Sequence, residues 1–161
     1  MKLQSLIKSL KFDYYDSNII EKNFPIQKTK KDSYYRVFSF DRDISSEDII
    51  KEMEKAGYRP ANIYELLIWA KKNWNDQNSV VALGSIWQDL SGYRSVPVLD
   101  SDDAKRELDL DWFERDWDAN YRFLAVRKYE NSNSLNPLIL ERLKVMYQEV
   151  GNLIMDLKHN Y

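Results

Sequence analysis

The 161-residue sequence predicts an α+β fold, with a small mixed or antiparallel sheet, two helices against it and a further helix at each end. Three observations support this class. Runs of aromatic and β-branched residues at 34–40, 80–87 and 121–128 have the composition of strands. Two segments, 46–56 and 62–74, begin with capping residues and continue with apolar residues at helical spacing. The length suits one domain with its own core.

The N-terminal segment 2–12 is expected to form a short amphipathic helix. We interpret it as packed on its own domain, and a membrane-surface or partner-docking helix is the alternative. Residues 13–33 are expected to be a solvated connector. The predicted regions are therefore an N-terminal helix and connector at 1–33, a core domain at 34–130 and a C-terminal helix at 131–161. The apolar residues at helical spacing in the first helix are Leu3, Leu6, Ile7 and Leu10.

Helix caps predict the two helices of the core. Ser45 with Asp48 three residues later resembles a capping box in which Asp replaces Glu. Gly57 is expected to end that helix. Asn62 and Glu65 repeat the capping pattern more faithfully, so a second helix is expected from residue 62 to residue 74.

The strands are predicted from apolar runs and from alternation. The nearly continuous run 80–87 is typical of a central strand covered on both faces, and Gly84 within it suggests a bulge or a close backbone approach. Residues 94–99 are expected to be the return strand of a hairpin, at an edge or broken at Pro97, which has no N–H. In 106–112 apolar and acidic residues alternate, which predicts one buried and one acidic face.

Pro137, at a first-turn position, is expected to open a long helix that ends near residue 158. Its seam of two and a half heptads is too short for an independent coiled coil, and Gly151 weakens it. Two interpretations remain, packing against the domain or the N-terminal helix, and a homo-oligomer formed through 137–158. The seam residues, at alternating spacings of four and three, are Ile139, Leu143, Met146, Val150, Leu153 and Leu157.

Composition argues against several classes of function. A formal net charge of -2 gives no field that attracts nucleic acid, so no nucleic-acid partner is expected. The chain has no cysteine, and its one histidine is His159 near the end, so thiolate chemistry and His-based catalysis or metal sites lack their main component. No segment has the composition of a secretory signal or a membrane span, so we expect a cytoplasmic protein without a membrane partner.

Carboxylates are crowded into residues 100–118. We interpret them as a solvated acidic face, and we expect no cofactor and no catalytic residue. Calcium is a weaker alternative, because it binds several converging carboxylate and carbonyl oxygens. The weak metal candidates are Asp111, Asp116 and Asp118. The carboxylates of this segment include Asp100, Asp102, Asp103, Asp109, Asp111, Glu114, Asp116 and Asp118.

Aromatic residues suggest a binding surface. Trp112 and Trp117 lie five residues apart in a charged segment, so we expect that they are not both buried. Exposed Trp, Tyr and Arg are the side chains that most often dominate binding energy at interfaces. The predicted ligand- or partner-binding residues are Tyr93, Arg94, Trp112, Arg115, Trp117 and Asn120.

The segment Asp116-Trp-Asp-Ala-Asn-Tyr-Arg-Phe-Leu-Ala-Val-Arg127 is similar to the Trp-Asn-Asp segment and final strand of C-type-lectin-like domains. Together with 59–70, residues 121–127 also resemble the branch that contains formylglycine-generating enzymes and the variable proteins of diversity-generating retroelements. The resemblance covers 34–128 and implies a rigid scaffold that presents a variable binding face. It does not carry over the calcium–sugar site, because the loop Val96-Pro97-Val98 has no oxygen-bearing side chain. Residues 34–128 also contain none of the cysteines and histidines that the enzymes of this branch use.

The leading hypothesis is therefore a non-enzymatic ligand- or protein-binding domain that uses a Trp/Tyr/Arg surface on a C-type-lectin-like scaffold. A structural or assembly protein that acts through its terminal helices is the alternative. A third hypothesis is an enzyme that depends on Asp and Glu or on a metal.

Overall fold

The computed structural model describes residues 2–29, 33–102, 105–128 and 137–159. The chain divides into two compact units, Met1–Lys128 and Tyr129–Tyr161. The first unit contains three helices and the ten strands that the structure describes, and the second contains α4 (Pro137–His159). This composition confirms the predicted α+β class, including a helix near each end of the chain.

The main sheet of the first unit is mixed. Its neighbouring strands run antiparallel except for two parallel pairs, β1 with β8 and β5 with β10. Beside this path, β4 (Tyr58–Pro60) pairs with β10 and β6 (Trp87–Gln88) pairs with β7. A separate two-stranded sheet joins β3 (Ile44–Ser45) to β9 (Asp116–Trp117). The strand order of the main path is β1 (Tyr14–Tyr15), β8 (Lys105–Trp112), β7 (Arg94–Asp102), β5 (Ser79–Val81), β10 (Tyr121–Arg127) and β2 (Tyr35–Phe38).

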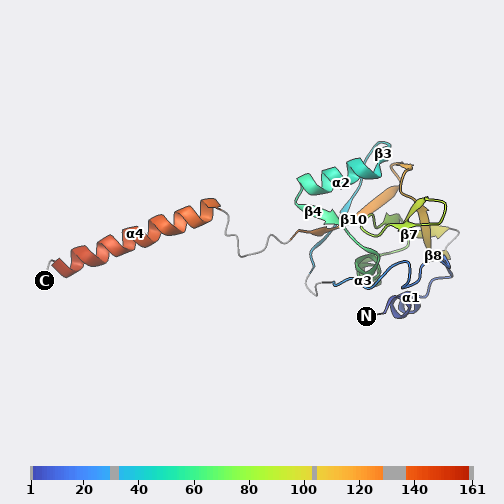
Figure 1. Ribbon diagram of the computed structural model, residues 1–161, viewed down its shortest axis with the longest axis horizontal. Helices are drawn as coiled ribbons and strands as arrows, with labels where there is room; N and C mark the ends of the chain where they lie inside the picture. Colours follow the sequence, from blue (N-terminus) through green and yellow to red (C-terminus); the bar gives the residue numbers. More distant parts are fainter. Residues whose placement is uncertain (1, 30–32, 103–104, 129–136, 160–161) are drawn as a thin grey trace. The chain divides into compact units, whose positions relative to one another are not determined.

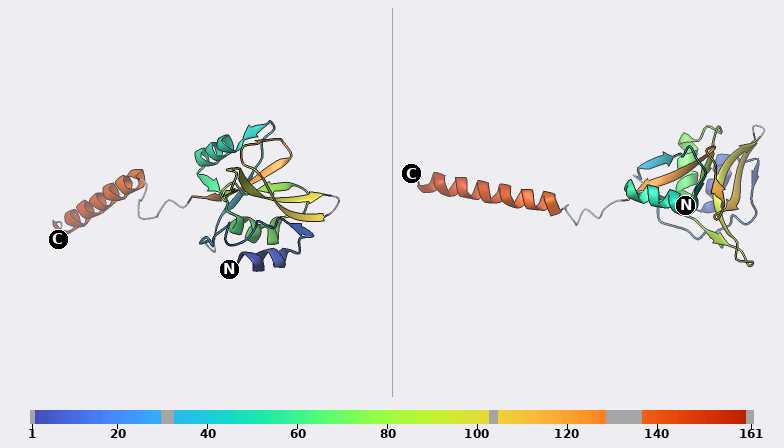
Figure 2. Two further views of the ribbon diagram at one scale, coloured as in Figure 1. Left: turned by 45° about the vertical axis from the view of Figure 1, so that its right-hand side comes forward. Right: turned by 90° about the horizontal axis from the view of Figure 1, so that it is seen from above.

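Helices cover both faces of this sheet. Figure 1 shows α2 (Ser46–Lys55) on one side and α1 (Leu3–Leu10) with α3 (Ile63–Asn73) on the other, and the left view of Figure 2 agrees. Alternate residues of β7 serve the two layers, because Leu99 packs in the cluster under α1 and α3, whereas Val98 packs in the cluster under α2. The apolar residues of α1 are at most 4% exposed, so this helix packs on its own domain, as expected.

The predicted caps are present. The Glu65 N–H donates to Asn62 Oδ1 at 2.9 Å, and the Asn62 N–H donates to Glu65 Oε2 at 3.0 Å. The buried Glu65 carboxylate also pairs with Arg59 at 2.6 Å, which compensates for its loss of water. At α2, the Asp48 N–H donates to Ser45 Oγ at 3.2 Å.

The run 80–87 is not one strand, because β5 ends at Val81 and β6 begins at Trp87. Gly84 lies between them, and a Cβ there would approach the Ala61 carbonyl oxygen to 2.6 Å, so the predicted close backbone approach is confirmed. The expectation of an edge or break at Pro97 is wrong, since β7 continues to Asp102 with partners on both sides. The missing N–H of Pro97 instead coincides with the end of the β5 ladder, where the Ala82 N–H donates to the Pro97 carbonyl at 3.0 Å.

The second unit contains the predicted long helix. Its described seam residues Ile139, Leu143, Met146 and Val150 are 37–58% exposed. No helix among the described residues is long and apolar enough to cross a membrane.

Candidate functional site

Two aromatic side chains form an exposed stack where β7 begins and β8 ends. Ser95 lies opposite Trp112, and Tyr93 is two residues before Ser95, so Tyr93 and Trp112 share one face of the sheet. Their ring centroids are 5.7 Å apart with an interplanar angle of 10°, and the residues are 57% and 60% exposed. We call this pair the aromatic platform. All five tryptophans lie in described segments, and Trp112 is the only exposed one.

The loop before β7 fixes the position of Tyr93. The Asp89 carboxylate accepts the N–H groups of Ser91 at 2.8 Å and Tyr93 at 3.0 Å, and Gly92 adopts a φ of +90°. Leu90, in the same loop, has no burial at all and adds apolar surface beside the turn. The sequence interpretation missed Leu90, although a leucine between Asp89 and Ser91-Gly92 in a turn had little chance of reaching the core.

Arg94 points to the opposite face of the sheet, as alternation along β7 requires. Its guanidinium lies 4.5 Å from the centroid of the Phe113 ring. Its Nε donates to Glu114 at 2.5 Å, and its other end lies 3.8 Å from Glu47 at the start of α2. Arg94 is therefore held by two carboxylates on the α2 side, and it does not join the aromatic platform.

Arg115 is also occupied by contacts within the domain. It forms an ion pair with Asp111 and donates to the Tyr121 hydroxyl at 3.3 Å. Its guanidinium lies 5.0 Å from the ring centroid of Trp117 and 4.9 Å from that of Tyr121. Burial raises the pKa of the Tyr121 hydroxyl, and the nearby Arg115 charge opposes that rise. Arg115 therefore packs over the loop that follows β8 and links it to Asp111 and Tyr121.

The expectation that Trp117 forms part of the surface is wrong. Trp117 is fully buried, since β9 pairs with β3 and turns the indole into the cluster under α2. Its Nε1–H donates to Ser46 Oγ at 2.8 Å, and the Ser46 hydroxyl donates to the Phe113 carbonyl at 2.6 Å. The rings of Tyr121 and Phe123 meet it edge-on at 4.9 and 5.7 Å.

Asn120 is exposed in the turn before β10, where its N–H donates to Asp118 Oδ1 at 2.8 Å. Of the six predicted binding residues, the structure therefore brings only Tyr93 and Trp112 into direct contact on an exposed face. Arg94 and Arg115 lie in ion pairs, Trp117 lies in the core, and Asn120 lies in a turn.

The acidic residues of β8 have a structural role. The pairing of β8 with β1 ends at Leu108, and beyond it the side chain of Asp109 accepts the Leu110 N–H at 2.8 Å while that of Asp111 accepts the Trp112 N–H at 2.7 Å. The N–H groups of Leu110 and Trp112 point away from β7, so these carboxylates satisfy donors on an open strand edge. Burial, together with the neighbouring acids Asp16, Asp111 and Asp100, raises the pKa of Asp109.

The expected metal candidates do not converge. Asp111 is committed to Arg115 and to the Trp112 N–H, while Asp118 accepts the Asn120 N–H. Asp116 pairs with Ser45 in the small sheet. Within the segments that the structure describes, no group of three or more His, Cys, Asp or Glu could hold a metal ion. Among the described residues, the structure therefore does not bring Asp111, Asp116 and Asp118 together as ligands of one ion.

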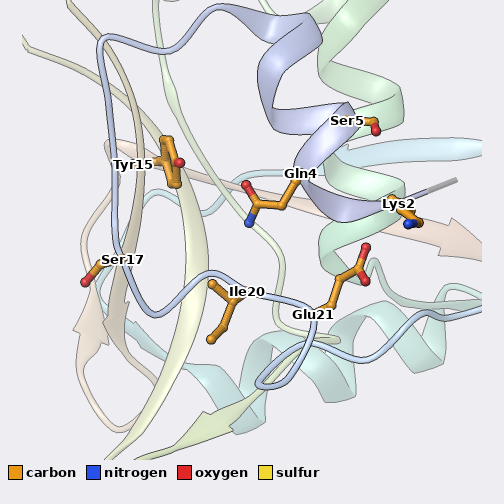
Figure 3. Close-up of a pocket in the computed structure, with 7 residues that line it drawn as sticks. All are labelled: Lys2, Gln4, Ser5, Tyr15, Ser17, Ile20 and Glu21. Atoms are coloured by element: carbon orange, nitrogen blue, oxygen red, sulfur yellow. The ribbon is translucent and has the colours of Figure 1, made fainter.

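An open depression of about 740 Å³ lies between α1 and the segment 15–21 (Figure 3). Its polar groups hold the N-terminal helix in place, because Glu21 Oε1 accepts the Leu3 N–H at 3.0 Å and Gln4 Nε2 donates to the Ile19 carbonyl at 3.1 Å. Tyr15 and Ile20 supply its exposed apolar surface. The polar side chains of Glu21 and Gln4 therefore hold α1 against the segment 15–21.

No family model, curated protein or solved structure matches this chain.

Proposed function

We propose that this protein is a non-enzymatic binding domain on a C-type-lectin-like scaffold, which recognises a protein partner through the aromatic platform of Tyr93 and Trp112. The observation that carries the proposal is the stacking of these two rings at 5.7 Å with more than half of each residue exposed. Tyr and Trp are enriched among the residues whose truncation weakens protein complexes most.

The platform is also preorganised, which favours tight binding. Stacking fixes the two side chains against each other, and the hydrogen bonds of Asp89 fix the backbone at Tyr93. Side chains that are ordered before association lose less conformational entropy when a partner binds. Leu90 is exposed three residues before Tyr93 in the same turn, and the paired charges of Arg94 and Glu114 lie on the opposite side of the strand.

The test compares three versions of the full chain as bait in quantitative affinity capture, wild type, Trp112→Ala and Tyr34→Ala. Tyr34 is a matched control because it is 64% exposed and its ring takes part in no stacked pair among the described residues. We expect a protein that wild type and Tyr34→Ala capture and Trp112→Ala loses. Recombined with that protein, Trp112→Ala should bind about thirtyfold more weakly by calorimetry, which corresponds to about 2 kcal/mol.

The proposal fails if Trp112→Ala and Tyr34→Ala capture the same proteins as wild type with the same yield while both remain folded at the temperature of the assay. Equal loss in both variants would assign the binding energy to general surface hydrophobicity.

A further inference from the structure

The helix α4 has a wide apolar face. In heptad positions, Leu143 and Val150 fall at a, while Ile139 and Met146 fall at d. Position e is also apolar, with Tyr147 80% exposed and Ile154 50% exposed. Three of seven positions are therefore apolar, which is the pattern of a helix that faces a bundle core.

Such a helix needs a surface to cover it. Its 23 residues give a length of about 35 Å, and helices in proteins draw most of their stability from packing of the apolar face. The a and d seam alone is too short for an independent coiled coil, but the apolar e position widens it, and a second copy of the same helix provides a self-complementary surface for this wider face. The orientation of the two copies then follows from the positions that flank the seam.

In a parallel pair of helices, charged residues of one copy would face apolar residues of the other. In that geometry each g residue faces the e residue of the partner helix, so Arg142 would face Tyr147 and Glu149 would face Ile154. Both charges would then lose water against an apolar side chain without a compensating partner.

In an antiparallel pair of helices, the charged g positions and the apolar e positions lie on separate flanks. There e faces e and g faces g, so the apolar Tyr147 meets Tyr147 of the second copy, while Arg142 and Glu149 lie on the opposite, hydrated flank, where Glu149 of one copy faces Glu149 of the other in contact with water. In the seam, Met146 lies opposite Val150 of the other copy, which centres the pair on residue 148. That residue is also the midpoint of Pro137–His159, so the register with matched a and d layers is the one with complete overlap. Opposed helix dipoles favour the same arrangement.

We propose that α4 is a homodimerisation helix that pairs antiparallel with α4 of a second copy of the chain, through a seam of Leu143, Met146 and Val150 with Tyr147 beside the twofold axis. A dimer carries two aromatic platforms. Binding to a partner with two sites would then gain from the high effective concentration of the second platform.

The first experiment measures the mass of the full chain by light scattering. We expect twice the chain mass of 19.3 kDa for wild type. Val150→Glu places a charge in the seam and should raise the dimer dissociation constant at least a hundredfold. Val145→Glu is the matched control, because Val145 is 50% exposed against 53% for Val150 and lies at position c, outside the seam. A monomeric wild type at about 100 μM, or equal effects of the two substitutions, overturns the proposal.

The second experiment determines the orientation. Since the chain has no cysteine, single variants can be cross-linked at one site with a short bismaleimide. Tyr147→Cys should cross-link within an antiparallel dimer, where the two copies of the residue are adjacent. Ile139→Cys should not, because its two copies would be about 27 Å apart along the helices. A parallel dimer reverses both results and overturns the proposal, as does a dimer in which neither variant cross-links.

Discussion

Trp112 and Trp117 are only five residues apart, and their environments are opposite. Trp112 ends β8 and is 60% exposed in a stack with Tyr93, whereas Trp117 is fully buried under α2. The difference does not come from the indole, which is the same, or from local charge, which is high around both. It comes from the strand partners, since the open edge of β8 leaves Trp112 in solvent and pairing with β3 directs Trp117 inward.

The two tryptophans also differ in expected role, since Trp117 should contribute to stability and Trp112 to recognition. The Trp117 indole has a hydrogen-bond acceptor and two edge-on rings, so its surroundings are complete within the domain. The Trp112 indole uses one ring face for Tyr93, and most of its remaining surface is open. Substitutions at Trp117 should therefore change folding, and substitutions at Trp112 should change binding.

The largest expected effect is that of Trp117→Ala. Truncation of a fully buried tryptophan in a packed cluster should lower the free energy of unfolding by about 3–5 kcal/mol. Trp112→Ala should lower it by about 1 kcal/mol, the range measured for one exposed aromatic pair. Urea unfolding followed by circular dichroism measures both values. Similar losses in the two variants would contradict the contrast between the two sites.

An intermediate effect is expected for Ser46→Ala. The Ser46 hydroxyl accepts from the Trp117 indole and donates to the Phe113 carbonyl, so its removal leaves two buried groups without this partner. We expect a loss of about 2 kcal/mol in the free energy of unfolding. On a Trp117→Phe background the same substitution should cost less, because only the carbonyl then lacks a partner. Additive effects in this double-mutant cycle would show that the hydroxyl does not couple to Trp117.

Sequence patterns predicted the elements whose information is local. The caps at Asn62 and Ser45 and the helical spacing in α1 and α4 each depend on neighbouring residues, and the structure contains all of them. The short strands β3 and β9 were not predicted, because a two-residue strand has no periodicity and exists only through its distant partner. The burial of Trp117 depends on that pairing, which explains why spacing along the chain could not distinguish it from Trp112.

The ion pairs of Arg94 could not be predicted for the same reason, whereas the partner of Arg115 is only four residues away. Arg94 and Arg115 were expected to belong to the binding surface because of their residue type. Their carboxylate partners are Glu47 and Glu114 for Arg94 and Asp111 for Arg115, and the contact with Glu47 spans 47 residues of sequence. The segment around 112–120 was correctly singled out as unusual, but only its first residue is available as an aromatic anchor.

The smallest expected effects on stability are those of substitutions at Asp109 and Asp111. Both carboxylates accept outward N–H groups of β8, but their other contacts differ. Asp111 also pairs with Arg115, which lies over Trp117, and so connects the two tryptophan sites. Asp109 has no ion-pair partner among the described residues, and its pKa is raised, chiefly by burial. Asn keeps an oxygen that can accept the N–H and removes the charge. The substitutions Asp109→Asn and Asp111→Asn should therefore shift the melting temperature in opposite directions at neutral pH.

Asp109→Asn should raise the melting temperature at pH 7 by about 1–3 °C, the size expected for a change of below 1 kcal/mol. Because the folded-state pKa of Asp109 lies above its unfolded value, the ionised group lowers stability above the folded pKa, and this loss disappears as the pH falls below the unfolded pKa of about 3.9. The gain should therefore shrink between pH 7 and pH 4. Asp111→Asn should instead lower the melting temperature at pH 7, since it removes the ion pair with Arg115. Equal shifts of one sign would mean that both carboxylates act only as acceptors for the strand edge, and that the link from Trp112 to Trp117 through Asp111 contributes nothing to stability.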